Sequence, residues 1–391
     1  MIDHIHTGDA LEILRGMPGE SVHCVVTSPP YWGLRDYGTG KWKGGAGDCD
    51  HRIMAYPEGA QTPGGRVGSM PKQETIQHDK CGKCGAIRTD KQLGLEKTPE
   101  EYVERMTAIF REVRRVLRGD GTAWVNMGDS YAGGGGFSPG APSNKKSLSG
   151  FRGTKSYGVN LGIRQGGHLK KKDLCGIPWR LAFALQADGW YLRQDIIWSK
   201  PNPMPESVTD RCTKAHEYIF LLSKSPKYYY DADAIKEPAS ESTHARVSQD
   251  VAEQIRSERA NGGSRADRPM KAVICTPKQA DPGNGNKIKN NSDWQNVHVL
   301  QVERRNKRSV WTVTTGGFSE AHFATFPEKL IEPCILAGCP VDGIVLDPFA
   351  GAGTTPLCAR KLSRHFIGIE LKPEYVEIAD RRLNAEIPLL L

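Results

Sequence analysis

The chain has 391 residues, 38% hydrophobic and 25% charged, a composition typical of a globular protein and not of a disordered or disulfide-stapled one. Its 53 Lys and Arg against 45 Asp and Glu give a net charge of +8, which favours a polyanionic partner without requiring one. It contains no apolar run of about 18 residues for a membrane span, and it starts without the basic and apolar parts of a signal peptide, so we expect a cytoplasmic protein with no membrane partner.

The first predicted strand covers residues 23–26, an apolar run that is ended by two prolines. The next segment, Ser28-Pro29-Pro30-Tyr31, therefore lies at the carboxyl end of a strand, where open α/β sheets bind their ligands. The prolines leave outward carbonyl oxygens without competing N–H groups, and Tyr31 and Trp32 offer flat stacking surfaces. This combination favours a planar base that carries amino protons. The alternative is a loop that only packs its aromatic residues.

Residues 38–90 are rich in Gly, Pro and charge and show no apolar periodicity, so we predict an irregular insertion. Cys81 and Cys84 have the spacing of half a zinc knuckle, and Cys49 and His51 can supply the other two ligands. Because this segment cannot bury a core of its own, a metal would be its main stabiliser. We predict a structural zinc remote from the chemistry; the alternative is four unliganded surface side chains.

The best-marked helix starts at Thr98, followed by proline and a capping-box glutamate, and its apolar residues repeat at helical spacing up to Gly119. A strand over residues 122–126 follows, as in a βαβ unit of a parallel sheet. Residues 133–172 then hold eight basic residues, eleven glycines and no acidic residue. That segment fits either a loop that closes over phosphates or a solvated linker. The next predicted elements are a helix near 178–187 and strands near 191–198 and 217–222.

Apolar periodicity disappears from residue 224 and returns at Val310. A capping box at residues 325–328 predicts a helix to about residue 337, with a kink at Pro333. A second βαβ unit closes the chain: a strand over 343–346, a glycine-rich turn, a helix from Thr354 and a strand over 366–369.

The glycine-rich turn has the features of a site for a nucleotide-like cofactor. Gly351 and Gly353 let a ligand approach the backbone, and the following helix offers free N–H groups. Glu370 comes 23 residues after Asp347, close to the spacing at which an acid reaches ribose hydroxyls. The glycine order matches neither a nicotinamide-cofactor fingerprint nor a P-loop. The alternative is an ordinary strand–helix turn.

Together, the two motifs resemble those of the S-adenosylmethionine-dependent DNA methyltransferases that modify exocyclic amino groups. More narrowly, the chain resembles the circularly permuted group, in which Pro-Pro-Tyr precedes the cofactor motif. The resemblance implies a Rossmann-like, doubly wound, mostly parallel α/β sheet. It implies that Asp9 contacts the adenine of the cofactor and that Glu370 binds its ribose. It further implies that the rest of the cofactor site consists of Phe323, Asp347, Phe349, Gly351, Gly353, Thr354 and Thr355.

The same resemblance implies direct methyl transfer to a base flipped out of the duplex and stacked on Tyr31. The Ser28 side chain and the Pro29 carbonyl would accept the amino protons. Within this family Ser before Pro-Pro-Tyr is typical of cytosine-N4 enzymes and Asp of adenine-N6 enzymes, so we predict a cytosine-N4 methyltransferase with adenine-N6 as the alternative. An RNA or protein amino methyltransferase and a catalytically inactive DNA-binding relative stay open, although protein-glutamine methyltransferases usually carry Asn before Pro-Pro-Tyr and place the cofactor loop first.

This interpretation divides the chain into five segments. Residues 1–48 hold the catalytic half of the core, 49–90 the zinc insertion, 91–223 the continued core, 224–310 a target-recognition region and 311–391 the cofactor half. The expected partner is double-stranded DNA; related enzymes are often dimers, and a homodimer, a cognate restriction endonuclease and the recognition sequence are left open. Five cysteines in apolar stretches are predicted to be buried: Cys24, Cys175, Cys334, Cys339 and Cys358.

Overall fold

The computed structural model describes residues 2–33, 40–49, 51, 81, 83–90, 92–96, 98–132, 168–170, 172–239, 304–316 and 326–386. Phe323, most of the basic segment 133–172 and most of the region 224–310 lie outside the described residues. The chain divides into two compact units, one made of Met1–Ala234 with Arg308–Leu391 and the other of Ile235–Lys307. Within the described residues, helices of sufficient length and apolarity to cross a membrane are absent.

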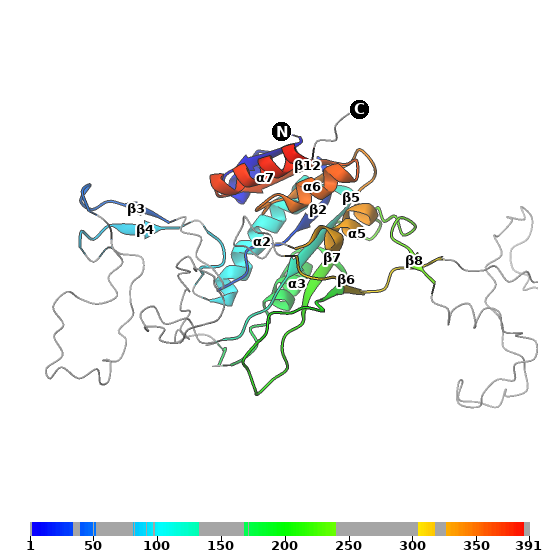
Figure 1. Ribbon diagram of the computed structural model, residues 1–391. Helices are drawn as coiled ribbons and strands as arrows, with labels where there is room; N and C mark the ends of the chain where they lie inside the picture. The colour runs from blue at the N-terminus through cyan, green and yellow to red at the C-terminus, as the bar shows by residue number, and fades with distance from the viewer. Residues whose placement is uncertain are drawn as a thin grey trace, which may run out of the picture. The chain divides into compact units, whose positions relative to one another are not determined.

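A sheet of eight strands forms the centre of the larger unit (Figure 1). From one edge to the other its strands are β1 (His4–Thr7), β12 (His365–Glu370), β11 (Ile344–Asp347), β2 (Val22–Thr27), β5 (Leu117–Met127), β7 (His216–Ser223), β6 (Tyr191–Ser199) and β10 (Val310–Thr312). Only β7 runs antiparallel to its two neighbours, and the other described pairs in this sheet are parallel. Strands from the two ends of the chain therefore lie side by side, which confirms the predicted mostly parallel sheet.

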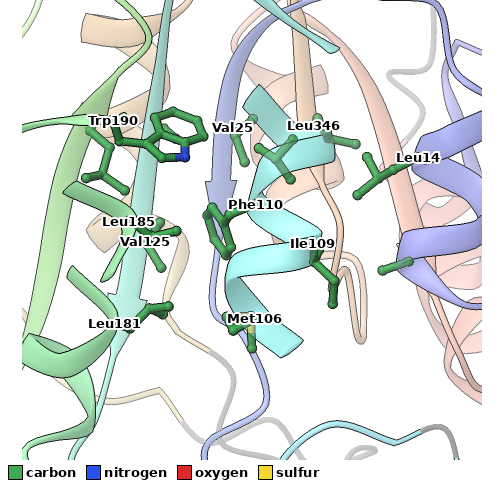
Figure 2. Close-up of a cluster of buried hydrophobic side chains, with 14 of the residues drawn as sticks. Leu14, Val25, Met106, Ile109, Phe110, Val125, Leu181, Leu185, Trp190 and Leu346 are labelled. Atoms are coloured by element: carbon green, nitrogen blue, oxygen red, sulfur yellow. The ribbon is translucent and has the colours of Figure 1, made fainter. Parts of the chain in front are cut away.

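Helices cover both faces of this sheet. On one face α1 (Ala10–Gly16), α2 (Pro99–Val116) and α3 (Ile177–Ala187) share a buried apolar cluster with β2, β5 and β11, and Figure 2 shows Phe110 between Leu14 and Leu185 in that cluster. The other described helices are α5 (Glu328–Gly338), α6 (Thr354–Lys361) and α7 (Pro373–Ala385). Helix α5 packs on β2 and β5, α6 on β11 and β12, and α7 on β1 and β12. Burial of the shared apolar faces of helices and sheet stabilises this layered arrangement.

Local sequence explains where α2 begins. The Thr98 side chain accepts a hydrogen bond from the Glu101 N–H at 3.1 Å, and Pro99 occupies the first helical turn. Helix α2 ends at Val116, so the strand β5 begins five residues before the predicted position 122.

The structure corrects two predictions. Residues 38–90 are not wholly irregular, because β3 (Lys41–Lys43) pairs antiparallel with β4 (Ile87–Thr89). Helix α5 is not opened by a side-chain cap: its N-cap is Pro327, which has no side-chain oxygen to offer, and Thr325 lies outside the described residues. Strands β1 and β10 and helices α1 and α7 were not predicted. All five cysteines predicted to be buried are buried.

The smaller unit, taken by itself, contains a short antiparallel pair of β8 (Glu237–Pro238) and β9 (Arg304–Arg305). Arg305 and Glu237 form an ion pair of 3.1 Å across it. This unit falls inside the predicted target-recognition region, and its role stays a prediction.

Candidate active site at the carboxyl edge of the sheet

The two predicted motifs meet because β2 and β11 are parallel neighbours, which brings their carboxyl ends to the same edge. At that edge Thr27 Oγ1 donates a hydrogen bond of 2.6 Å to Asp347 Oδ1. Thr355 Oγ1 donates at 3.2 Å to the carbonyl oxygen of Val26. The Ser28–Tyr31 corner is therefore tied directly to the glycine-rich turn.

Asp347 is a buried acid, only 2% exposed. Burial raises its pKa to about 6, although the hydrogen bonds from Thr27 and from the Phe349 N–H, the latter 3.0 Å long, pull it downward. A carboxyl group in this state changes its charge near neutral pH. Asp347 lies at the end of β11, and its ionised form would attract a cationic ligand bound there.

Glu370 ends β12 and borders the same turn. Its two carboxylate oxygens accept the N–H groups of Gly351, at 3.0 Å, and Lys372, at 2.8 Å. Burial raises the pKa of Glu370, while these two backbone bonds lower it. Each carboxylate oxygen has a second lone pair, so the group can still accept two hydroxyl groups.

The turn itself requires glycine at one position for two reasons. Gly353 has a φ of +76°, and a Cβ there would lie 2.7 Å from the Ala379 Cβ on α7. Gly351 also has a positive φ, of +52°, with open space where its Cβ would be. That the first N–H groups of α6 bind a ligand stays a prediction. Thr354 is buried, and its hydroxyl accepts a bond of 3.2 Å from Arg382.

Asp9 and Phe349 lie in the loops that follow β1 and β11. Thr7 pairs with Glu370, and the Gly8 N–H donates at 2.8 Å to the Glu370 carbonyl oxygen, so the loop from β1 to α1 lies beside the acid. The Asp9 side chain accepts the Glu12 N–H at 3.0 Å and thereby caps α1. Phe349 packs, partly buried, against the core cluster. Their contacts to a cofactor stay predictions, as does that of Phe323 outside the described residues.

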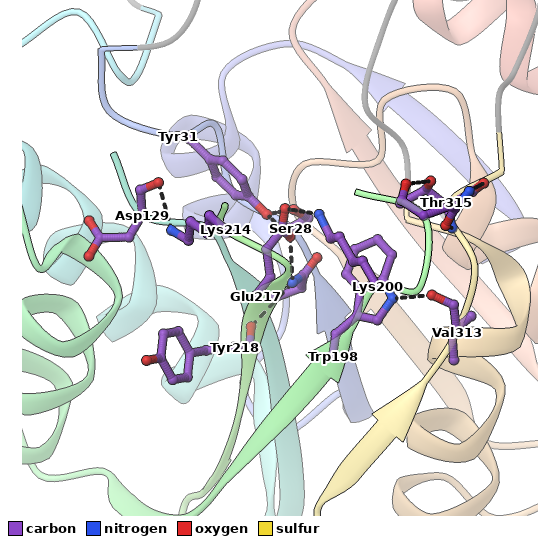
Figure 3. Close-up of polar contacts among 12 residues, drawn as sticks. Ser28, Tyr31, Asp129, Trp198, Lys200, Lys214, Glu217, Tyr218, Val313 and Thr315 are labelled. Carbon is purple, nitrogen blue, oxygen red and sulfur yellow. Dashed lines mark hydrogen bonds and ion pairs between the residues drawn. The ribbon is translucent and has the colours of Figure 1, made fainter. Parts of the chain in front are cut away.

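After Thr27, the Ser28–Tyr31 corner is held by one side chain from β7 and one from α2, and Figure 3 shows the first of these, Glu217. Ser28 Oγ lies 3.5 Å from Tyr31 Oη, and Tyr31 Oη donates at 2.8 Å to Glu217. The Pro30 carbonyl oxygen accepts the hydroxyl of Tyr102 at 2.9 Å. A Cβ at Gly128 would lie 2.6 Å from Tyr31 Cε2, so the absence of a side chain there leaves room for the ring.

Several polar residues of this edge escaped the sequence analysis. Glu217 accepts from Asn126 at 3.2 Å and forms an ion pair with Lys200. Lys214 Nζ donates at 2.8 Å to the Asp129 carbonyl oxygen, and burial lowers the pKa of Lys214. Because β7 is antiparallel, its first residues reach the edge that the parallel strands reach with their last ones. In the sequence, the only indication of Glu217 is that it is an acid directly before the apolar run 218–222. Whether that acid lies at the site edge or at the opposite edge depends on the direction of the strand.

The four predicted metal ligands come together on the β3–β4 hairpin. Their ligand atoms, from Cys49, His51, Cys81 and Cys84, all lie within 4.8 Å of one another. Cys49 Sγ is 3.7 Å from Cys81 Sγ, and Cys84 Sγ is 3.3 Å from His51 Nδ1. Backbone N–H donation and His51 lower the pKa of the Cys81 thiol to about 6, which favours the thiolate form. Three sulfurs and one imidazole nitrogen gathered this closely are a donor set that fits Zn²⁺.

Comparison with known proteins gives a consistent picture. The model of a family described as DNA methylase, N6_N4_Mtase, matches residues 22–381. The type II methyltransferase M.Cfr9I of Citrobacter freundii is 39% identical over 380 residues, which cover 97% of this chain and 87% of that protein. M.SmaI of Serratia marcescens is 37% identical, with 97% and 90% covered. The solved structure of PvuII DNA methyltransferase (cytosine-N4-specific) shares the fold, with a TM-score of 0.51, 17% identity, and 97% and 88% of the two chains covered.

Proposed function

The chain belongs to the N6/N4 family of DNA methylases, and on that premise we propose that it transfers a methyl group from S-adenosylmethionine to the N4 amino group of cytosine in duplex DNA. One observation carries the proposal: the hydrogen bond between Thr27 and Asp347, which joins the Ser28–Tyr31 corner to the glycine-rich turn. A methyl donor on the turn and a base at the corner would thus be neighbours.

The chemistry at the corner follows from the weakness of an exocyclic amine as a nucleophile, since its lone pair is delocalised into the ring. When bound, S-adenosylmethionine supplies an electrophilic methyl group. Ser28 Oγ and the Pro29 carbonyl oxygen would accept hydrogen bonds from the two amino N–H groups, so that the nitrogen can pyramidalise. As the nitrogen–methyl bond forms, the methyl–sulfur bond would break, S-adenosylhomocysteine would leave, and the methylated nitrogen would give up one proton to solvent. These acceptors stabilise the positive charge that develops on nitrogen. No covalent intermediate with a cysteine is required.

The target base must leave the duplex to reach Ser28, at a cost of roughly a few kcal/mol. We assign its stacking surface to Tyr31. The choice of cytosine rests on Ser28 as the residue before Pro-Pro-Tyr; adenine N6 is the alternative within the family.

The cofactor contacts follow the arrangement around the turn. Glu370 accepts the ribose hydroxyls with its remaining lone pairs, and the ionised Asp347 attracts the cationic methionine end. Asp9 borders Glu370 and is assigned to the adenine. The remaining contacts are assigned to Phe323, Phe349, Gly351, Gly353, Thr354 and Thr355.

We also assign a structural zinc to Cys49, His51, Cys81 and Cys84. The support is the donor set, its spacing and the stacking of the Trp42 ring on His51, with centroids 5.3 Å apart. Gly45 fits the same cradle, because a Cβ there would lie 2.5 Å from Cys84 Sγ. The hairpin offers little apolar surface of its own, so the metal would hold it in shape.

The test is transfer of a labelled methyl group from S-adenosylmethionine to unmethylated duplex DNA, in competition with RNA and with peptides. We expect label in DNA alone, and label in RNA or peptide would redirect the proposal to those substrates. Sequencing of the modified DNA gives the recognition sequence. The type II name of the relatives supports a partner endonuclease of the same specificity, and light scattering tests whether the protein is a monomer or a homodimer.

A further inference from the structure

We propose that Glu217 is a positioning residue: it fixes the direction of the hydrogen bonds through Tyr31 to Ser28, so that Ser28 presents lone pairs and not its proton to the target amine. The inference rests on the proposed function and deepens it. It assigns a role in methyl transfer to a residue on β7, far in sequence from either motif.

The first step is the environment of the Glu217 carboxylate, whose side chain is only 16% exposed. One oxygen accepts the Tyr31 hydroxyl at 2.8 Å and the Asn126 amide at 3.2 Å, and the other is paired with the Lys200 ammonium (Figure 3). Every one of these partners is a donor. A carboxylate held by three donors, one of them cationic, acts only as an acceptor.

The second step is the direction that this acceptor imposes. Burial, and after it the charge of Glu217, raises the pKa of Tyr31 well above its usual range, so the phenol keeps its proton. That single proton is used on Glu217. Towards Ser28, Tyr31 can therefore offer only a lone pair, and Ser28 must donate its own proton across the 3.5 Å between the two oxygens.

The third step is what remains on Ser28. A hydroxyl has one proton and two lone pairs. With the proton directed at Tyr31, both lone pairs are available to an amine N–H, which is the requirement of the proposed transfer. The Ser28–Tyr31 contact is long, and such contacts tighten when the substrate is bound.

The residues around Glu217 hold the hydrogen bonds from Glu217 through Tyr31 to Ser28 in one geometry. Lys200 lies over the Trp198 ring, with its ammonium 4.2 Å from the ring centroid, and so stays beside Glu217. The second Asn126 hydrogen is used on the Tyr218 carbonyl oxygen at 3.2 Å. In this geometry both neighbours approach Glu217 as donors, so the carboxylate is the acceptor for Tyr31.

Glu217→Gln is the informative change because it keeps the shape and reverses the polarity. In this variant the amide oxygen would accept from Lys200, so the NH₂ group would point at Tyr31 Oη. Because the Tyr31 oxygen would then accept a hydrogen bond from the amide, its own proton would be donated to Ser28. Tyr31→Phe keeps the stacking ring and deletes only the oxygen. Glu112→Gln is the matched control: Glu112 is a partly buried acid paired with Arg115, near the end of α2 that leads into the start of β5, at the opposite edge of the sheet.

The experiment measures methyl transfer to a duplex that carries the mapped recognition site. We expect kcat to fall about 10- to 100-fold in Glu217→Gln and in Tyr31→Phe, the same size as the loss when a residue that orients a metal ligand is changed. The KM for S-adenosylmethionine, and its Kd by calorimetry, should change less than twofold. Because both residues act through one chain, the double variant should be no slower than the slower single variant.

The inference is overturned by a kcat within twofold of the wild type in Glu217→Gln, by losses that multiply in the double variant, or by a parallel loss in cofactor affinity, which would indicate a general structural defect. An equal loss in Glu112→Gln would do the same. If the wild-type protein itself transfers no methyl group to DNA, the proposed function fails and this inference with it. An active wild type with an unaffected Glu217→Gln variant rejects the inference alone.

Discussion

Thr27 and Asp347 lie 320 positions apart in the chain and share a hydrogen bond of 2.6 Å between adjacent parallel strands. The bond joins the last residue of β2 to the last residue of β11. Each strand continues directly into one of the two motifs. The position of the corner relative to the turn is therefore fixed by the sheet and not by flexible loops.

Loss of the hydrogen bond between Thr27 and Asp347 should lower the stability of the folded protein. Thr27→Val keeps the side-chain shape but removes the donor to a buried acid, so we expect a loss of about 1–3 kcal/mol in the free energy of unfolding, measured with urea. Thr107→Val is the control, because that hydroxyl donates only within α2, to Val103, at 2.7 Å. Equal stability of the two variants would contradict a special role for Thr27.

Asp347 should make stability depend on pH. Its pKa rises from 3.8 in the unfolded chain to about 6 in the folded protein, so folding favours its protonated form. The stabilisation is complete below pH 3.8 and is lost as the pH rises through about 6. Between pH 5.0 and 7.5, ionisation of Asp347 should lower the free energy of unfolding of the wild type by about 1–2 kcal/mol. The Asp347→Asn variant lacks this contribution.

Urea unfolding of both proteins at the two pH values measures this difference. The stability of Asp347→Asn relative to the wild type should increase with pH. A relative stability that stays constant or decreases would show that Asp347 is ionised in the folded protein across this range.

Glu370 should contribute mainly to cofactor affinity. Glu370→Ala removes the carboxylate that accepts the ribose hydroxyls; a total loss of about 1.5–3 kcal/mol of hydrogen-bond energy should raise the Kd for S-adenosylmethionine about 10- to 150-fold. Calorimetry measures it. Glu374→Gln, in the first turn of α7, is the control. Unchanged binding in Glu370→Ala would place the ribose elsewhere.

The zinc site should depend on each of its thiolates. Cys84→Ser should reduce the metal content from one equivalent to a small fraction, as measured by elemental analysis of protein purified without chelator. Cys212→Ser, which changes an exposed free cysteine, should retain the full equivalent. Well under one equivalent in the wild type would reject the site.

The parts of the fold that carry strong local signals were predictable from the sequence. The capping residue Thr98 placed the start of α2, and short apolar runs bounded by proline and glycine placed β2 and β11. The family prediction is confirmed by the match to the family model. It was possible from the sequence because the two family motifs directly follow β2 and β11, whose positions were predicted. Strand β1 was missed since only Ile5 of its four residues is buried, which leaves no alternating pattern.

Other features depend on tertiary contacts that no local pattern encodes. The direction of β7 brings Glu217 to Tyr31, and the apolar pattern of residues 217–222 does not indicate in which direction the strand runs. The hairpin of β3 and β4 joins segments separated by a long stretch without apolar periodicity. Helix α7 did carry a signal, with buried Val376, Ala379 and Leu383 at helical spacing after Pro373.

The nucleosides of DNA methylated by the purified protein test the central claim most directly. Unmethylated duplex DNA is incubated with S-adenosylmethionine, digested and analysed by mass spectrometry, with Ser28→Ala run in parallel. We predict N4-methylcytosine as the product, and a rate at least 100-fold lower for the variant. N6-methyladenine would contradict the assignment of the base, and DNA without any methylated nucleoside would contradict the site as a whole.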